Sequence, residues 1–156
     1  MEAARPALPA DRPRVVELAG AAISELAVNR GGALWSRREA RAVPVDASID
    51  EALVAADRHL VVGTIDGVVV GYGLVRVEVL RDGGRLGVLE DLYVEPDARG
   101  VGVGEAIMGI VLEWCGAQGC FGVDSLVLPG DRAAKNFFES FGLVARAIVV
   151  HRALDA

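Results

Sequence analysis

The chain has little of the material from which metal sites, disulfide frameworks and membrane spans are built. Its 156 residues include only two histidines and two cysteines, Cys115 and Cys120. Because these lack the paired Cys/His spacing of a zinc site, we expect no metal and two reduced core thiols. No apolar run reaches the roughly 18 residues of a membrane span, and the first thirty residues hold acids, arginines and prolines instead of an apolar signal. The expected location is the cytoplasm, away from any membrane.

The chain also has fewer basic than acidic residues, 16 lysines and arginines against 22 aspartates and glutamates. The net charge of −6 argues against general affinity for nucleic acid or an anionic membrane. An acidic surface favours cationic partners such as free amines, although acidity also serves solubility alone. The length is that of about one domain with one substantial core, so residues 1–156 are expected to form a single domain.

What the chain does have is a glycine-rich turn between a strand and a helix. The turn is Arg99-Gly100-Val101-Gly102-Val103-Gly104, preceded by the strand-like residues 89–96 and followed by an apolar helical stretch from Glu105 to Gln118. The first turn of a helix has free amides and the positive end of the helix dipole, and glycines let the chain approach a ligand closely. This segment is therefore predicted to hold an anion such as a pyrophosphate.

The spacing excludes two familiar phosphate loops. A dinucleotide fingerprint would need a third glycine at Glu105 or at Ile107, depending on where it began. A nucleoside-triphosphate loop would need lysine and then serine or threonine after Gly109, where Ile110 stands.

The turn instead resembles the acyl-CoA pyrophosphate loop of the GNAT superfamily of N-acyltransferases, Arg-x-x-Gly-x-Gly after a strand ending Leu-Tyr-Val-x-Pro. A second segment, residues 131–143, is similar to the family's Asn-x-x-Ala-x-x-Phe-Tyr-Glu-x-x-Gly-Phe pattern at the expected distance. It matches at Ala134, Phe137, Glu139 and Gly142. Residues 5–11, with two prolines before an apolar helix, are similar to the family's opening.

The resemblance implies an α/β fold in the order β-α-α-β-β-β-α-β-α-β. Its sheet would be twisted, mixed and mostly antiparallel, with helices on both faces and an acyl-CoA cleft where two neighbouring strands splay apart. The residue patterns agree in several places: Asp66-Gly67 predicts a hairpin turn, and Asp11, Ser48 and Asp131 are candidate N-caps. The expected helices are 13–26, 35–41, a short one from Ser48, 104–118 and one from Asp131, and the expected strands are 60–65, 68–79, 86–94, 125–128 and 144–150.

Acetyl-CoA is the cosubstrate that the resemblance implies. In the family a strand bulge turns a backbone N–H toward the thioester carbonyl, and here this would fall on the Leu92–Val94 backbone. The residues expected to contact the cofactor are Leu92, Tyr93, Val94, Arg99, Gly100, Val101, Gly102, Val103, Gly104, Glu105, Asn136 and Phe138.

Glu90 is the candidate for the base that accepts the amine's proton. Strict alternation places it on the same side of its strand as Val88, Leu92 and Val94, where partial burial would raise the pKa of a carboxyl group. Two alternatives remain open. Glu90 could form an ordinary cross-strand ion pair with an arginine such as Arg76, or Asp91 could face the cleft instead.

The sequence departs from the family's pattern at two positions. Phe138 stands where the family offers a tyrosine to the leaving thiolate, and a phenyl ring has no proton to donate. We expect Phe137 to pack into the core and Phe138 to turn toward the cleft. Asp131 replaces an asparagine and is interpreted as a helix cap, while Tyr72 and Tyr93 are interpreted as strand packing.

Two functions follow from these residues. The first is transfer of an acetyl group from acetyl-CoA to a primary amine of a small molecule, peptide or protein, by direct attack in a ternary complex. The second is a non-catalytic acyl-CoA-binding regulatory module with a degenerate site. Trp35, Arg37 and Arg38 lie where the family builds its acceptor pocket, or form an amphipathic helix with a tryptophan anchor. The acceptor and the assembly state are left open, a homodimer included.

Overall fold

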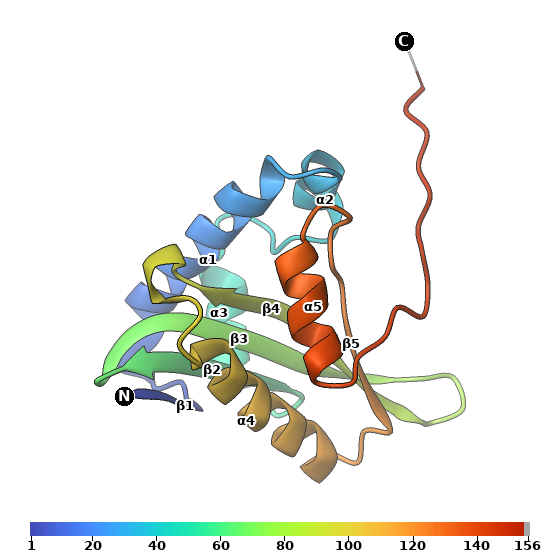
Figure 1. Cartoon of the computed structure of the whole chain (residues 1–156). Coiled ribbons are helices and arrows are strands. Elements are labelled where there is room, and N and C mark those ends of the chain that lie inside the picture. Colours follow the sequence, from blue (N-terminus) through green and yellow to red (C-terminus); the bar gives the residue numbers. More distant parts are fainter. Residues whose placement is uncertain (155–156) are drawn as a thin grey trace.

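The computed structural model describes residues 1–154, which form one five-stranded sheet with helices on both faces (Figure 1). The strands lie in chain order across the sheet, and every pair is antiparallel except β4 and β5, which are parallel. In chain order the elements are β1 (Glu2–Pro6), α1 (Arg12–Ala27), α2 (Gly32–Arg38), α3 (Asp46–Val54), β2 (Arg58–Ile65), β3 (Val68–Val79), β4 (Arg85–Val94), α4 (Val103–Ala117), β5 (Gly122–Ser125) and α5 (Arg132–Ser140). This confirms the predicted fold class.

The β2–β3 hairpin forms where the sequence predicts it. Asp66 and Gly67 are the two turn residues, with φ angles of 49° and 83°. Positive φ at both positions gives the turn a twist that matches the right-handed twist of the strands, which is why Asp-Gly is favoured there. A second turn, over residues 80–84, joins β3 to β4, with the Leu80 amide donating to the Gly84 carbonyl at 2.7 Å.

The two faces of the sheet carry separate apolar clusters. Helices α1 and α3 cover one face, and α4 and α5 cover the other (Figure 1). On the first face the buried residues include Val15, Leu18, Ile49, Leu60, Val62, Tyr72, Leu74 and Tyr93. On the second they include Val61, Val75, Leu89, Val103, Ile107, Met108, Val111, Cys115 and Phe138.

Helix α4 lies close to the sheet because three strands present glycine beneath it. A Cβ added at Gly63 would come within 2.5 Å of a Val103 methyl, and one added at Gly73 within 2.7 Å of Ile107 Cγ2. A Cβ at Gly87 would come within 2.6 Å of the Cys115 sulfur. Side chains at these positions would push the helix, and the glycine turn that precedes it, away from β4.

The three candidate N-caps had different outcomes. The Asp131 carboxylate accepts a hydrogen bond from the Ala134 amide at 3.1 Å, so this residue is the helix cap that the sequence predicts. The prediction for Ser48 was wrong, because α3 begins earlier, at Asp46, and the Ser48 hydroxyl donates to the Val45 carbonyl. Asp11 occupies the predicted N-cap position of α1, but its carboxylate accepts from Arg5 and from the Leu8 amide and makes no capping bond to the helix.

The last two predicted strands differ from the structure. Strand β5 spans Gly122–Ser125, earlier than the predicted 125–128. Its pairing with β4 begins at Gly122 and ends at Ser125, opposite Leu89. The strand predicted over 144–150 was wrong: this segment is extended and exposed, with no strand assigned to it. Its β-branched residues favour a strand, but a strand also needs a partner, and none is provided here.

Two further properties bear on the chemistry. Among residues 1–154, no helix combines the length and apolar character needed to cross a membrane. Cys115, near the end of α4, is a free thiol buried between that helix and the sheet. Burial raises its pKa to about 11. A thiol that stays protonated at neutral pH is a poor nucleophile, which fits a packing role.

Candidate functional site

Strands β4 and β5 separate partway along their length. Their parallel ladder ends where Leu89 pairs with Ser125, while β4 continues to Val94. Beyond this point β4 has β3 on one side and no strand on the other. The predicted splay between neighbouring strands is therefore present, and the chain leaves β5 for the loop that leads to α5.

The orientation of the β4 amides follows from its pairing with β3. The Glu95 amide donates to the Val70 carbonyl at 2.9 Å, and the register is regular from Asp91 to Val94. Backbone groups alternate in direction along an antiparallel strand, so the N–H groups of Leu92 and Val94 point away from β3. They face the side that β5 has left, where they can donate to a ligand oxygen.

The irregularity in β4 lies at Glu90, upstream of the predicted position. Leu74 pairs with Asp91 and Val75 with Leu89, which leaves Glu90 without a partner on β3. A bulge of one residue shifts the alternation of side chains. Leu89 therefore packs with Leu92 and Val94 on the α4 side, and the predicted strict alternation through Glu90 was wrong.

Three arginines surround the Glu90 carboxylate without reaching hydrogen-bond distance. Its oxygens lie 3.6 Å from Arg76 Nε, 3.8 Å from Arg41 Nη2 and 4.0 Å from Arg58 Nη1. The ion pair with Arg76, one of the two alternatives, is thus present. The side chain is 27% exposed, so this carboxylate is still reached by solvent beside the point where β4 leaves β5.

Asp91 belongs to a buried polar network on the α1 side. Arg41 donates to both of its oxygens, at 2.9 and 3.0 Å, and the Tyr72 hydroxyl donates at 2.6 Å. The Arg41 and Asp91 side chains are 6% and 15% exposed. Burial raises the pKa of the Tyr72 hydroxyl, and the Asp91 carboxylate adds to this. Burial is the largest single influence on the pKa of Arg41 and lowers it, but the hydrogen bonds to Asp91 together with the nearby charges of Asp91 and Glu90 raise the pKa above its usual value.

The glycine turn has the geometry expected of an anion cradle. Gly100 and Gly102 have φ angles of 81° and 105°, in the left-handed region that glycine favours. Gly102 is the N-cap of α4, with no side-chain cap, and its carbonyl accepts from the Ala106 amide. The amides before Ala106 in the first turn have no acceptor within the helix. A Cβ at Gly100 would meet no atom within 4 Å, so the turn is open on this side.

Arg99 is fastened to α1 and to the end of β4. Its guanidinium donates to both Glu25 oxygens, at 2.8 and 3.0 Å, and to the Val94 carbonyl at 2.7 Å. It also lies 5.4 Å from the centre of the Tyr93 ring. These contacts hold the start of the turn in place and largely neutralise the charge of this side chain.

The two phenylalanines of α5 both pack in the apolar cluster under α4. Phe138 is 8% exposed within the apolar cluster under α4, whereas Phe137 lies against the first turn of α4. A Cβ at Gly104 would come within 3.2 Å of the Phe137 ring. The expected core packing of Phe137 is therefore present, whereas Phe138, which was expected to turn toward the cleft, is the more deeply buried of the two. Asn136, the other expected contact on this helix, is exposed.

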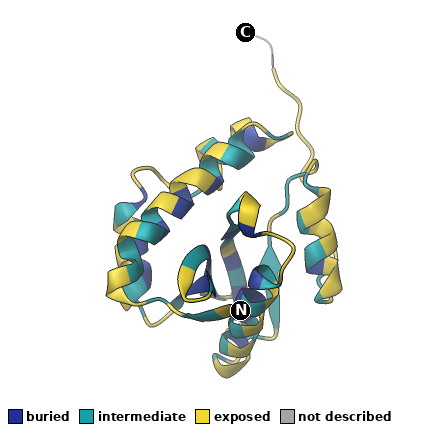
Figure 2. Cartoon of the chain, turned by 60° about the vertical axis from the view of Figure 1, so that its left-hand side comes forward, coloured by how far each residue is buried: buried dark blue, intermediate teal, exposed yellow. Residues whose placement is uncertain are grey.

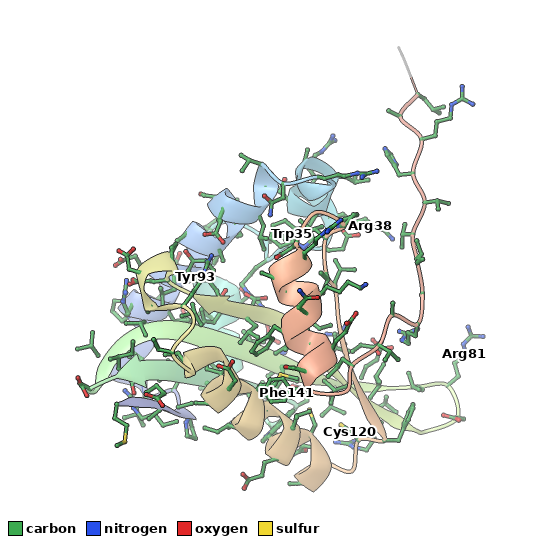
Figure 3. The ribbon with its side chains drawn as sticks, in the orientation of Figure 1. Trp35, Arg38, Arg81, Tyr93, Cys120 and Phe141 are labelled. Atoms are coloured by element: carbon green, nitrogen blue, oxygen red, sulfur yellow. The ribbon has the colours of Figure 1, made fainter. Side chains whose placement is uncertain are left out.

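Trp35, Arg37 and Arg38, the residues expected near the acceptor, belong to α2, which lies near the N-terminal end of α5. Figure 3 shows Trp35 and Arg38 of α2 beside the start of that helix. The neighbouring loops touch, since a Cβ at Gly31 would come within 3.5 Å of the Pro129 ring. Trp35 is half-buried, and Arg37 and Arg38 are exposed.

Sequence reasoning missed the network around Asp91. Tyr72 and Asp91 stand in otherwise apolar strands, and a buried polar side chain needs a partner. That signal was available, but the partner Arg41 lies far away in the chain, and its position depends on the path between α2 and α3.

The comparisons with known proteins agree with this architecture. A curated relative, the thialysine N-epsilon-acetyltransferase of Bos taurus, is 36% identical over 74 residues. That stretch covers 47% of this chain and 44% of the relative, so the match spans less than half of the relative's length.

Several solved structures share the fold at low sequence identity. AAC(6')-Iy in complex with the bisubstrate analog CoA-S-monomethyl-acetylneamine has a TM-score of 0.75 at 17% identity, with 100% of this chain and 99% of that chain covered. Glucosamine-6-phosphate N-acetyltransferase from Arabidopsis thaliana has a TM-score of 0.70 at 22% identity, with 99% of each chain covered. A tetramutant of the BH1408 protein from Bacillus halodurans reaches 0.80 at 19% identity, covering 97% of this chain and 99% of that chain.

The family-level comparison covers most of the sequence. The matched residues, 21–143, include β4 with its splay from β5, the glycine turn and the α5 segment. Because the sequence model of the Acetyltransferase (GNAT) family matches across all of these elements, the chain belongs to that family.

Proposed function

We propose that the protein is an N-acetyltransferase that moves an acetyl group from acetyl-CoA to a primary amine, by direct attack within a ternary complex. The observation that carries the proposal is the splay of β4 from β5 at Leu89 and Ser125, directly before the glycine turn. An open strand edge and an uncapped helix N-terminus together suit a long ligand with an amide-containing arm and a pyrophosphate.

The cofactor would be held by backbone groups. The first-turn amides of α4 from Val103 to Glu105, with Gly100 and Gly102 in left-handed conformations, suit the pyrophosphate. The Leu92 and Val94 amides suit the arm and the thioester oxygen. Val101 would lie over the cradle, and Arg99 would act by holding the turn against α1. Phe137 supports the first turn of α4 from the side of α5.

The transfer requires two proton movements. As the amine nitrogen bonds to the acetyl carbon and the carbon–sulfur bond breaks, one N–H proton must leave the amine and one proton must reach the sulfur. We propose that Glu90 accepts the amine's proton, directly or through water. No side-chain acid is assigned to the sulfur, because Phe138 is buried and has no proton, and a thiolate leaves readily enough for water to supply one.

The acceptor is proposed to be a small-molecule amine. The named relatives act on thialysine and glucosamine-6-phosphate, and another neighbour is described as an aminoglycoside N-acetyltransferase. The first experiment is therefore thiol release from acetyl-CoA with a panel of an amino acid amine, an amino sugar, an aminoglycoside and a lysine peptide. Tight acetyl-CoA binding without release for any amine would favour the non-catalytic regulatory module.

Glu90→Gln tests the base. We expect kcat to fall about 10²-fold, the acid limb of the rate profile to change and acetyl-CoA affinity to stay within a few-fold. Glu78→Gln is the matched control, because Glu78 also pairs with Arg76, at 3.2 Å, but stands near the end of β3. It should keep normal turnover. Near-normal turnover of Glu90→Gln would assign the proton to another group or to bulk water.

Val101→Glu tests the cradle. Val101 is 53% exposed and its φ is not positive, so the substitution introduces a charge without backbone strain. A carboxylate beside a bound pyrophosphate should weaken acetyl-CoA binding about tenfold, measured by calorimetry. Val101→Gln has nearly the same shape without the charge and should bind normally. Equal affinity of the two variants would remove the pyrophosphate from this turn.

A further inference from the structure

Positive charge is concentrated in one segment of this acidic chain. Residues 28–43, which include α2 and the turns on either side of it, contain Arg30, Arg37, Arg38 and Arg41 and a single acid, Glu39. The whole chain has a net charge of −6. A local surplus of one sign attracts ligands of the other sign, even where the overall charge is opposite. This segment is therefore suited to an anion.

Three of these arginines have donors that a ligand can use. The outer sides of the helices are exposed (Figure 2), and Arg30, Arg37 and Arg38 are exposed side chains. Arg38 lies 3.7 Å from Glu39, beyond hydrogen-bond distance, and among residues 1–154 the other two form no ion pair. A guanidinium presents five N–H donors in a planar fork that matches a carboxylate or a phosphate.

The fourth arginine connects this segment to Glu90. The Arg41 side chain is buried, donates to both Asp91 oxygens, and has its Nη2 atom 3.8 Å from the Glu90 carboxylate. Arg38 stands three residues before Arg41, so their Cα atoms are at most about 11 Å apart. A small ligand with one end at Glu90 can therefore extend to the guanidinium groups of α2.

The other two arginines around Glu90 are already matched by acids. Arg58 lies 3.7 Å from Glu51 and 3.9 Å from Asp57, and Arg76 lies 3.2 Å from Glu78. The positive surplus is thus on the α2 side of Glu90.

The start of α5 forms the other side of this region. A Cβ at Gly130 would come within 3.6 Å of Arg30 Cβ, and Figure 3 shows Arg38 beside the start of α5. Arg132, in the first turn of α5, is exposed and adds a further positive charge. The carboxylate of the neighbouring Asp131 is engaged in capping the helix. Both sides of the region therefore favour a negatively charged group.

We propose that the amine acceptor also carries an anionic group, a carboxylate or a phosphate, which Arg37 and Arg38 bind while the amine lies at Glu90. This rests on the proposed function, because it takes Glu90 as the group that receives the acceptor's amine. The acceptor is then a small molecule with charges of both signs, such as an amino acid or an amino sugar phosphate. The same arginines disfavour an amine that has several positive charges and no anion.

The first test compares acceptors that differ only in the anionic group. Lysine is paired with lysinamide, and glucosamine-6-phosphate with glucosamine, in the thiol-release assay. The charged member of at least one pair should have a kcat/KM about tenfold higher or more, because the neutral member lacks hydrogen bonds to a charged group. The pair that shows the difference distinguishes a carboxylate from a phosphate. If the amines are acetylated and neither pair shows it, this proposal is overturned and the proposed function stands.

The second test assigns the preference to α2. The double substitution Arg37→Gln with Arg38→Gln should reduce the preference for the charged member about tenfold, mainly through KM. Arg81→Gln is the matched control, because Arg81 is an exposed arginine on the turn between β3 and β4, apart from α2 in Figure 3. It should keep the preference. A double variant that retains the full preference overturns the proposal.

A binding measurement separates this proposal from the transfer reaction. Calorimetry in the presence of CoA, which has no acetyl group to give, measures the affinity for lysine and for glucosamine-6-phosphate without chemistry. Binding that the double substitution weakens about tenfold supports the anion site, even if no amine releases thiol from acetyl-CoA and the proposed transfer fails. Absence of binding for both charged amines, or binding that the double variant leaves unchanged, overturns the proposal.

Discussion

The two faces of the sheet solve the packing of a helix in opposite ways. On the α1 and α3 side, the strands present large side chains, and a charged network of Arg41, Asp91 and Tyr72 is buried beside them. On the α4 side, three strands present glycine where the helix crosses, so that α4 rests almost on the backbone. Both faces bury apolar side chains, but the first adds a buried polar network and the second adds a close approach of helix to backbone.

The difference has a functional meaning. Close approach fixes the depth of α4, and its N-terminus carries the amides of the glycine turn. On the α1 side, the hydrogen bonds of Asp91 to Arg41 and Tyr72 instead hold β4 in position directly after the bulge at Glu90. Each face thus positions one half of the candidate site, and each should fail in its own way when it is disturbed.

The largest expected effect is on the polar face. Asp91→Ala leaves Arg41 as a buried charge without its partner, so the free energy of unfolding should fall by about 3 to 5 kcal/mol, measured by urea denaturation. Tyr72→Phe keeps the ion pair and removes one hydrogen bond to a charged group, which should cost about 1.5 to 3 kcal/mol. Asp50→Ala, which breaks an exposed pair with Arg12, is the control and should change little. Equal losses at Asp91 and Asp50 would mean that the network is not buried in solution.

A smaller effect is expected on the glycine face. Gly73→Ala places a methyl 2.7 Å from Ile107 Cγ2, which should cost about 1 to 3 kcal/mol. In an Ile107→Ala background the same substitution should cost almost nothing, a coupling that a double-mutant cycle measures. Gly109→Ala is the control, since nothing lies within 4 Å of it in α4, and it should stabilise the protein by up to about 1 kcal/mol. Additive effects of Gly73→Ala and Ile107→Ala would show that the helix has room to move.

The smallest expected effect is a difference in acid sensitivity. The hydrogen bonds from Arg5 lower the pKa of Asp11 below its ordinary value of 3.8. Its contribution to stability is therefore complete above about pH 3.8 and is lost as the pH falls through the lower, folded-state pKa. Asp11→Asn should flatten the acid limb of the stability curve, as followed by circular dichroism, whereas Gly109→Ala should leave the shape of that limb unchanged. An unchanged acid limb in Asp11→Asn would place the acid sensitivity elsewhere.

What the sequence predicts well is what depends on near neighbours. The Asp66-Gly67 turn and the Asp131 cap are confirmed because each is decided within about four residues. The strand over 144–150 was predicted on the same kind of evidence and is wrong, because its propensity is real but its pairing is a tertiary property.

The site itself was predicted only in part, for the same reason. The splay of β4 from β5 follows from the family resemblance, and it is present. The surroundings of Glu90 depend on a one-residue bulge that no alternation rule contains, so the sequence placed Leu89 and Leu92 on opposite faces. The burial of Phe138 was not predicted, because the roll of α5 on α4 is set by tertiary packing, with Phe137 against Gly104.

The bulge at Glu90 also changes which residues of β4 face which side of the sheet, so that the odd-numbered residues before it and after it lie on opposite faces. Before it, the odd-numbered Leu89 serves the α4 face; after it, the odd-numbered Tyr93 serves the α1 face. No single substitution can undo this, because the phase is set by the number of residues and not by their identity. Deleting Glu90 would remove the bulge and leave the other side chains of β4 on their present faces, because Leu89 and Asp91 already point to opposite sides of the sheet. The extra residue therefore adds a carboxylate beside the splay without moving an apolar side chain of the strand.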